Sequence, residues 1–343
     1  HHRPDRAVHP PSPISGICSR PRRSYAAGVD LAERLSALDV DGLTDRALRT
    51  AQLGLIAARV GFDAHVFAMT DPATGIVTSP HATVPMVAPG DLPAVIRRRY
   101  STASVTQWRT VLAELGVTDT VSMTLQDRWG RWGFLELWRC SAGFTDRERD
   151  RLAGLPPVLT ASLRMAVART FTVPDAPPTR LESGVILLDD DLQVRSVTSG
   201  AGRALMRMLP PTEPGPPVPA AAYNVVAALL AHEDGIWPGE PWARVHLGAS
   251  RWASVRAERL EDRIAVSIGP STTTERADLF ARAHQLSPRQ SEVLHLALHG
   301  MDTRAIADEL VIAHSTTEDH LKALLAKTDS TSRHQLLARA LGG

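Results

Sequence analysis

The last 68 residues of the chain (276–343) carry closely spaced signals for the starts and ends of helices and no pattern typical of a strand. A capping box, in which Ser or Thr is followed three residues later by Glu or Gln, favours a helix start, and Gly favours a helix end. The expected elements are a helix from Ser287 to Gly300, a helix begun by Asp302 or Thr303, a turn at 311–314, a helix over 315–327 and a helix begun by Ser332. Four short helices with a tight turn between the second and third predict an all-α domain of the helix-turn-helix kind.

Residues 29–171 mix helical and strand patterns. Leucines recur at helical spacing at the start of this region, and short apolar runs separated by turn residues follow. The expected elements are helices over 31–38 and 44–60, a β-hairpin over 62–78 with its turn at 71–75, a helix over 91–99, strands over 121–125 and 132–139, and a helix begun by Thr145 that Pro156 and Pro157 interrupt before residue 171. Helices beside a meandering antiparallel sheet predict an α+β domain.

A second, smaller α+β domain is expected over residues 183–270. Prolines mark 172–182 as a linker, and the Arg- and Pro-containing stretch 1–28, which has no apolar periodicity, predicts a disordered tail. Six prolines between 210 and 219 exclude regular structure there. The expected elements are strands over 184–188 and 192–197, helices over 199–209 and 220–232, and strands over 243–247, 251–256 and 264–268.

Composition and motifs exclude several classes of protein. No apolar run reaches the roughly 18 to 20 residues needed to span a bilayer. Cys18 and Cys140 are the only cysteines, so a disulfide framework is excluded and a reducing cytoplasm is expected. No nucleophile-elbow, zinc-protease, phosphate-loop or complete dinucleotide motif is present, so we expect no enzyme activity and no cofactor. His295 and His299 have metal-ligand spacing but no third ligand nearby in the sequence, so no metal site is expected either.

The C-terminal segment resembles the LuxR-type helix-turn-helix over about residues 286–340. The resemblance is carried, in the family's order and spacing, by Leu286-Ser-Pro-Arg-Gln-Ser-Glu-Val-Leu294, Gly300, Thr303-Arg-Ala-Ile-Ala-Asp-Glu-Leu310, Thr316, His320-Leu321, Arg333 and Leu336. In that family the third helix enters the major groove of DNA, while the second helix and flanking basic residues hold the backbone. The resemblance implies a cytoplasmic transcriptional regulator that binds double-stranded operator DNA as a homodimer, with RNA polymerase as a candidate partner.

Carried over by position, the resemblance assigns Arg304 to a phosphate contact. The other expected DNA-binding residues are Thr316, Thr317, Glu318, Asp319, His320, Lys322, Lys327 and Arg333. Two of these leave alternatives open. His320 either packs or contacts a phosphate, and Glu318 either accepts a hydrogen bond from cytosine or closes a capping box with Ser315. The position of Thr317 is usually Val in the family.

The charge of this segment is balanced, with eight basic and eight acidic residues between 276 and 343. Nonspecific DNA binding strengthens with the number of phosphates that a protein neutralises. One copy is therefore expected to bind DNA weakly, and a dimer that contacts two half-sites is required. The neutral charge, together with Glu318 and Asp319 on the third helix, leaves open an alternative in which the helix-turn-helix docks a protein and the chain is a sensor or scaffold.

The two upstream domains resemble sensor units of large bacterial regulators. Residues 29–171 are similar to a GAF-type domain through the stretches 70–79, 132–138 and 144–148, and residues 183–270 are similar to a PAS-type domain through 184–189 and 251–255. The resemblance implies that a small-molecule effector binds in the GAF-like domain and changes the geometry of the dimer. The fold class expected is thus two α+β sensor domains followed by a four-helix domain at 276–343.

Several conspicuous residues of the first domain have ordinary structural interpretations. Cys140 is expected to be buried, and the run Arg97-Arg98-Arg99 is expected to be a solvated helix end rather than a grip on an anionic effector. The tryptophans of this region are expected to be mainly core and only secondarily a pocket lining; they are Trp108, Trp129, Trp132 and Trp138.

Overall fold

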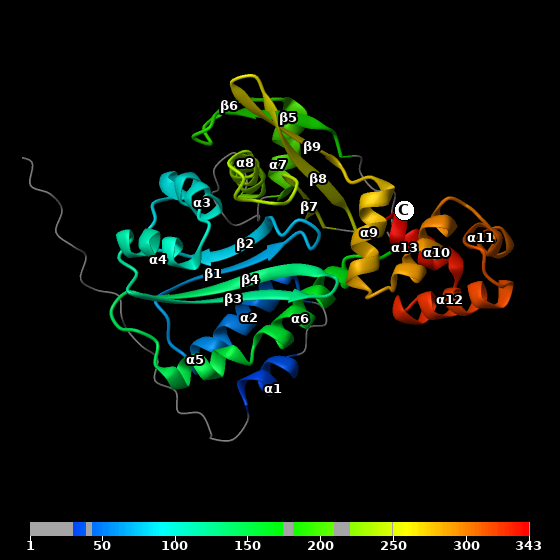
Figure 1. Cartoon of the computed structure of the whole chain (residues 1–343), viewed down its shortest axis with the longest axis horizontal. Helices are drawn as coiled ribbons and strands as arrows, with labels where there is room; N and C mark the ends of the chain where they lie inside the picture. The colour runs from blue at the N-terminus through cyan, green and yellow to red at the C-terminus, as the bar shows by residue number, and fades with distance from the viewer. Residues whose placement is uncertain (1–29, 39–42, 174–180, 209–219, 249, 343) are drawn as a thin grey trace, which may run out of the picture.

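The computed structural model describes residues 30–38, 43–173, 181–208, 220–248 and 250–342. The predicted tail at 1–28, the prolines of the predicted linker and the proline-rich stretch 210–219 lie outside these ranges. Figure 1 shows two sheet-containing units next to each other, with the C-terminal helices projecting at one end. Within the described ranges, no helix is long and apolar enough to cross a membrane and no group of three or more potential metal ligands occurs.

The first unit contains an antiparallel sheet of four strands in the order β2-β1-β4-β3. Helix α6 packs on β3 and β4, and α1 and α2 pack on α6, so one face of the sheet is covered by its own helices (Figure 1). The elements are α1 (Leu31–Ser36), α2 (Asp45–Ala57), β1 (Ala64–Thr70), β2 (Val77–Thr83), a 3₁₀ turn (Pro89–Asp91), α3 (Leu92–Tyr100), α4 (Val105–Glu114), β3 (Asp119–Asp127), β4 (Gly130–Arg139), α5 (Asp146–Ala153) and α6 (Pro156–Arg169). This arrangement confirms the α+β class expected for the region.

Two elements of the first unit differ from expectation. Strand β2 continues to Thr83, five residues beyond the predicted end, because it lies at the sheet edge, where Pro80 is tolerated. Helix α4 was missed, although Ser104 caps it by accepting a hydrogen bond from the Gln107 amide. Its buried face is formed by Trp108, Val111 and Leu112, at the spacing typical of one helix face.

The second unit is a five-stranded antiparallel sheet in the order β6-β5-β9-β8-β7, with α7 on β5 and β9. Its elements are β5 (Gly184–Leu188), β6 (Val194–Val197), α7 (Ser199–Met208), α8 (Ala220–Glu233), β7 (Trp242–His246), β8 (Trp252–Leu260) and β9 (Arg263–Pro270). Each of these was expected within a few residues. The sequence did not indicate, however, how the two sheets are joined.

Helix α8 lies between the two sheets (Figure 1). It packs on β7, β8 and β9 of its own unit and on β2 and α3 of the first unit. Ten of its 14 residues are buried, which explains why it is apolar on almost every side rather than along one stripe. The second unit therefore covers part of the face of the first sheet that α6 leaves free, and α4 of the first unit covers another part.

The C-terminal region consists of α9 (Thr273–Ala283), α10 (Pro288–Leu298), α11 (Thr303–Leu310), α12 (His314–Lys327) and α13 (Arg333–Leu341). The four predicted helices are confirmed, and the side chains of Ser287, Asp302 and Ser332 cap the helices assigned to them. Helix α9 was not predicted, although Thr272 and Glu275 form a complete capping box at its start. It connects the sheet units to the helix-turn-helix.

The joint between the two sheet units contains a cluster of three charged residues, which we call the Arg244 cluster (Asp71, Arg244 and Asp278). The Arg244 guanidinium on β7 makes two hydrogen bonds to the carboxylate of Asp71, which follows β1, at 2.7 and 2.8 Å. It also donates to Asp278 on α9 at 2.8 Å. Burial alone would lower the pKa of Arg244, but the two carboxylates outweigh it and hold the pKa above its ordinary value.

A second joint holds the C-terminal helices against the sheet units through Arg276 on α9, in what we call the Arg276 cluster (Ser250, Arg276, Arg339 and Ala340). The Arg276 guanidinium donates to the carbonyls of Ser250, Arg339 and Ala340 and to the Ser250 hydroxyl, at 2.6 to 3.0 Å. It contacts no carboxylate among the residues that the structure describes, and burial lowers its pKa to about 10. Its acceptors include the last carbonyls of α13, the negative end of that helix.

Aromatic side chains line the same joint. Phe171, just after α6, stacks with Trp252 on β8 at 5.9 Å between ring centroids and meets Phe280 on α9 edge to face at 5.2 Å. His246 lies against Trp252, and His284 lies against Phe280. The first unit, the second unit and α9 thus share one aromatic contact region next to the helix-turn-helix.

Candidate nucleic-acid interface

The turn between α11 and α12 is closed by the backbone. The Ile312 amide donates to the Ala307 carbonyl at 3.0 Å, and Val311 takes left-handed dihedral angles (φ 53°, ψ 50°). A β-branched residue is strained in this region. The Val311 side chain is 88% exposed, so nothing in the protein packs on it. This turn sets the angle at which α12 leaves α11.

Helix α12 begins at His314, with Ala313 as its N-cap residue, and no side chain caps it. The capping-box interpretation of Ser315 and Glu318 is therefore wrong, because both residues already lie inside the helix. Glu318 instead lies 3.8 Å from the Nδ1 atom of His314, one turn earlier. Its side chain is about half exposed and faces solvent.

Thr317 is the one expected groove residue that the structure buries completely, with no exposed area. The assignment of Thr317 to the DNA-facing side is therefore wrong. Thr317 precedes the buried Leu324 by seven residues, which is two helical turns, so the two share the face that packs on the rest of the domain. Its hydroxyl has no hydrogen-bond partner in the part of the chain that the structure describes. The usual Val of the family at this position was the signal that this is a packing position.

Two residues that were expected to contact DNA make hydrogen bonds within the domain instead. The Lys327 ammonium donates to the Gln285 carbonyl at 2.8 Å and to the Gln290 side chain at 2.9 Å, so it braces the start of α10. The half-buried Arg333 donates to the Met301 carbonyl, next to the start of α11. Both residues therefore hold parts of the domain together.

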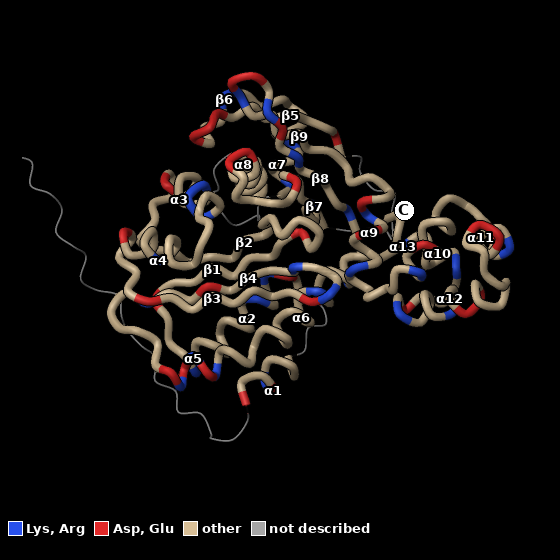
Figure 2. Tube along the Cα trace, viewed as in Figure 1, with Lys and Arg blue, Asp and Glu red and all other residues tan. Residues whose placement is uncertain are grey.

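The remaining expected residues lie on the outside. Arg304 in the first turn of α11 is exposed, and His320 is half-buried. Lys322 is 76% exposed and lies 3.7 Å from the equally exposed Asp319. The exposed polar residues of α11 and α12 are Arg304, Asp308, Glu309, His314, Ser315, Thr316, Glu318, Asp319, Lys322 and Lys327. Figure 2 shows acidic and basic residues intermixed over these two helices.

A second candidate site is a cavity of about 960 Å³ that the two sheet units share. Trp108 and Trp138, both buried, lie in its wall, and their indole N–H groups donate to the buried carboxylate of Glu136 at 3.1 and 3.3 Å. Trp132 is buried on the other face of the sheet, where it bonds Asp127. The expectation of core tryptophans is confirmed for these three, whereas Trp129 is half-buried and donates to the Leu286 carbonyl.

The arginine run and the cysteine differ from expectation. Arg97, Arg98 and Arg99 are not simply solvated, since they pair with Asp191, Glu114 and Glu136 respectively. Cys140, expected to be buried, is exposed at the end of β4. Slight burial and the nearby Asp63 carboxylate raise the pKa of its thiol, which disfavours the reactive thiolate.

Comparison with known proteins agrees with the geometry of the C-terminal helices. Residues 284–340 match the family described as bacterial regulatory proteins, luxR family. The C-terminal part of the chain is a LuxR-family helix-turn-helix domain. A relative from Bacillus subtilis (strain 168), the transcriptional regulatory protein DesR, is 33% identical over 63 residues. That match covers 18% of this chain and 32% of the relative, so the chain aligns with about a third of the relative's length.

Proposed function

We propose that the chain is a DNA-binding transcriptional regulator in which α12 enters the major groove of an operator. The main support is the exposed side of α12, where Thr316, Asp319 and Lys322 follow one another at intervals of three residues, so that each lies next to the following one. Lysine can read guanine and aspartate can accept from cytosine, so these side chains suit the edges of base pairs. Arg304 supplies a phosphate contact beside the groove.

The near-neutral domain makes affinity depend on two copies. The ion pair between Lys322 and Asp319 is fully exposed to solvent and therefore weak, so a DNA phosphate or base can replace it. A homodimer would place two α12 helices on half-sites about one helical turn of DNA apart. The GAF-like and PAS-like units are the proposed signal input of a cytoplasmic regulator, and RNA polymerase is the proposed further partner.

The deciding experiment is selection of genomic DNA fragments by the purified chain at near-physiological salt. The wild type is expected to enrich a shared, roughly palindromic site, and the double variant Arg304→Ala, Lys322→Ala is expected to lose it. The matched control is Arg147→Ala, Arg151→Ala, which removes two exposed positive charges from α5 and should enrich the same site. Enrichment that survives in the first double variant would contradict the assigned interface.

A second candidate function is supported by the mixed charge of α11 and α12 and by the exposed Val311 between them (Figure 2). Such a surface suits the docking of a protein, in a sensor or scaffold that no longer reads DNA. The salt dependence of DNA retention separates the two functions. A regulator gives a steep slope that flattens in Lys322→Ala, whereas a protein-docking domain gives no specific retention at any salt concentration.

A further inference from the structure

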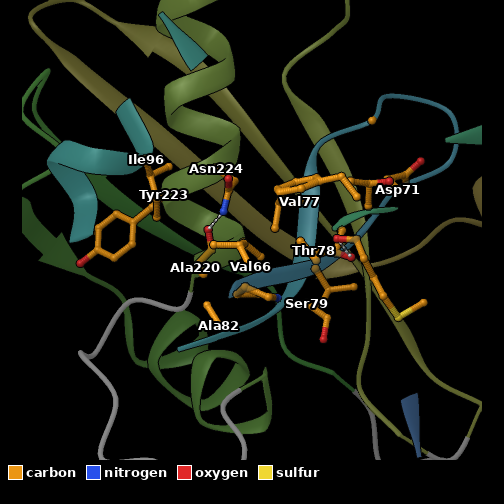
Figure 3. A pocket seen from close by; sticks show the side chains of 18 of the residues that line it. Val66, Asp71, Val77, Thr78, Ser79, Ala82, Ile96, Ala220, Tyr223 and Asn224 are labelled. Carbon is orange, nitrogen blue, oxygen red and sulfur yellow. Dashed lines mark hydrogen bonds between the residues drawn. The ribbon is translucent and has the colours of Figure 1, made fainter. Parts of the chain in front are cut away.

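The cavity between the two sheet units has walls from both of them. Val66, Val77 and Ala82 come from β1 and β2, while Tyr223 and Asn224 come from α8, and these side chains face one another across the space in Figure 3. Its volume of about 960 Å³ is at the upper end of the range for small-molecule sites. Neither unit encloses this space by itself.

One end of the cavity carries an arginine with unused hydrogen-bonding capacity. Among the described residues, the Arg99 guanidinium makes one hydrogen bond, 3.0 Å long, to Glu136, and it lies over the ring of Trp108 at 5.0 Å. A guanidinium has five N–H donors, so most of those on Arg99 remain available to a ligand. Glu136, in contrast, already accepts from three donors and is only 2% exposed.

Aromatic rings form part of the same wall. The ring of Trp237, which follows α8, lies 5.3 Å from that of Tyr100, and both residues line the cavity. The indole nitrogen of Trp237 is itself buried, so a ligand would meet the Trp237 ring as apolar surface.

We propose that this shared cavity binds a mostly apolar molecule that carries one carboxylate or similar anionic group, with the anion held by Arg99. The lining supplies apolar walls, the spare donors of Arg99 and five arginines against three acidic residues, Asp45, Asp71 and Glu136, all of which are already ion-paired. An anion fits this balance. An ammonium ligand would meet Arg99 and a carboxylate whose acceptor sites are already in use.

The ligand would be the signal to which the proposed regulator responds, and this role rests on the proposed regulatory function. Asp71 and Arg244 line the same cavity, and Arg244 bonds Asp278 on α9, the helix that leads into the DNA-binding domain. A ligand between α8 and β1–β2 therefore touches the joint on which the position of α9 depends. Its binding would favour one arrangement of the sheet units and hence one placement of α12.

The test is calorimetric titration of the full chain, without DNA, with apolar carboxylates of about 8 to 16 carbons, a range suited to the cavity. The alcohol and the primary amine of each chain length serve as neutral and cationic comparisons. We expect the acid to bind more tightly than both, and to change the fluorescence of the tryptophans in the lining. No binding by any acid, or equal binding by acid and amine, would overturn the proposal.

Two variants locate the site. Arg99→Gln should weaken binding of the acid about tenfold or more, the value of a charge-assisted hydrogen bond, and leave binding of the alcohol nearly unchanged. Arg98→Gln is the matched control, since Arg98 is the next residue, pairs with Glu114 and lies outside the lining. Equal losses in the two variants would refute the role of Arg99.

A third variant tests the space itself. Val66→Phe puts a larger side chain on a strand position that faces the cavity, and strands accept aromatic residues well. Acid and alcohol should both lose affinity while the circular dichroism spectrum stays native. Because none of these measurements involves DNA, a failure of the ligand proposal leaves the DNA-binding proposal standing, and a failure of DNA selection leaves this one standing.

Discussion

Arg244, between the two sheet units, and Arg276, between the second unit and the C-terminal helices, are 1% and 5% exposed, yet their partners differ. Arg244 is matched by the carboxylates of Asp71 and Asp278, whereas Arg276 is held mostly by backbone carbonyls. Carbonyls carry partial charges that water can replace, but a buried carboxylate that loses its partner has no substitute. The first joint is therefore expected to be rigid, and the second is the place where the helix-turn-helix can shift.

The largest effect is expected at the first joint. Arg244→Met leaves Asp71 buried without its cation and should lower the free energy of unfolding by about 3 to 5 kcal/mol. The matched control is Arg97→Met, because the Arg97–Asp191 pair also links the two units but is exposed. That change should cost less than about 1 kcal/mol in urea denaturation. Similar losses for the two variants would remove the distinction between the buried and the exposed link.

A smaller loss of stability is expected at acid pH, from two buried histidines next to the second joint. Burial lowers the pKa of His246 and of His284 to about 4, from 6.5. The folded state thus binds fewer protons than the unfolded state between these values, so stability is complete above pH 6.5 and falls as the pH drops toward 4. At pH 5 the loss is about 2 kcal/mol per histidine.

Urea denaturation at pH 7.5 and pH 5 checks this expectation. His284→Gln should reduce the stability difference between the two pH values, since glutamine does not titrate. His334→Gln, at an exposed position on α13, should leave the difference unchanged. An unchanged difference in His284→Gln would show that this histidine is not neutral in the fold.

The smallest loss of stability is expected when Arg276 is substituted. Arg276→Gln removes a buried cation that has no carboxylate beside it among the described residues, so the lost hydrogen bonds are partly offset because a charge is no longer buried. We expect a loss of about 1 to 2 kcal/mol, with faster hydrogen exchange confined to α9 and α13. A loss as large as that of Arg244→Met would mean that both joints are equally rigid.

Local signals were enough for most of the elements but not for their contacts. Capping boxes predicted α5 and α10, apolar periodicity predicted α12, and the box at Thr272 could have predicted α9 as well. The partners of Arg244 lie up to 173 residues away, and no pattern within a short window carries such a pairing. The shared cavity was missed for the same reason, because part of its wall comes from another unit.

At the candidate interface, too, the sequence alone did not show which side chains are exposed and which are used inside the domain. Position in the motif predicted Lys322 and Arg304 as DNA contacts, and the structure leaves both side chains exposed. Position also suggested Thr317, Lys327 and Arg333, which the structure uses for packing or internal hydrogen bonds. A helix has two faces, and only the buried Leu324 shows which residues belong to the inner one.

The position of α8 between the two sheets has a consequence for synthesis of the chain. The first sheet is complete at Arg139, and α4 already covers part of its second face, but α8, which covers another part, begins at Ala220, roughly 80 residues later. At about 5 to 20 residues per second, the ribosome needs about 4 to 16 seconds to make that stretch. During this interval the part of the nascent sheet that α8 covers later stays exposed, which makes it a natural client of chaperones that act during translation.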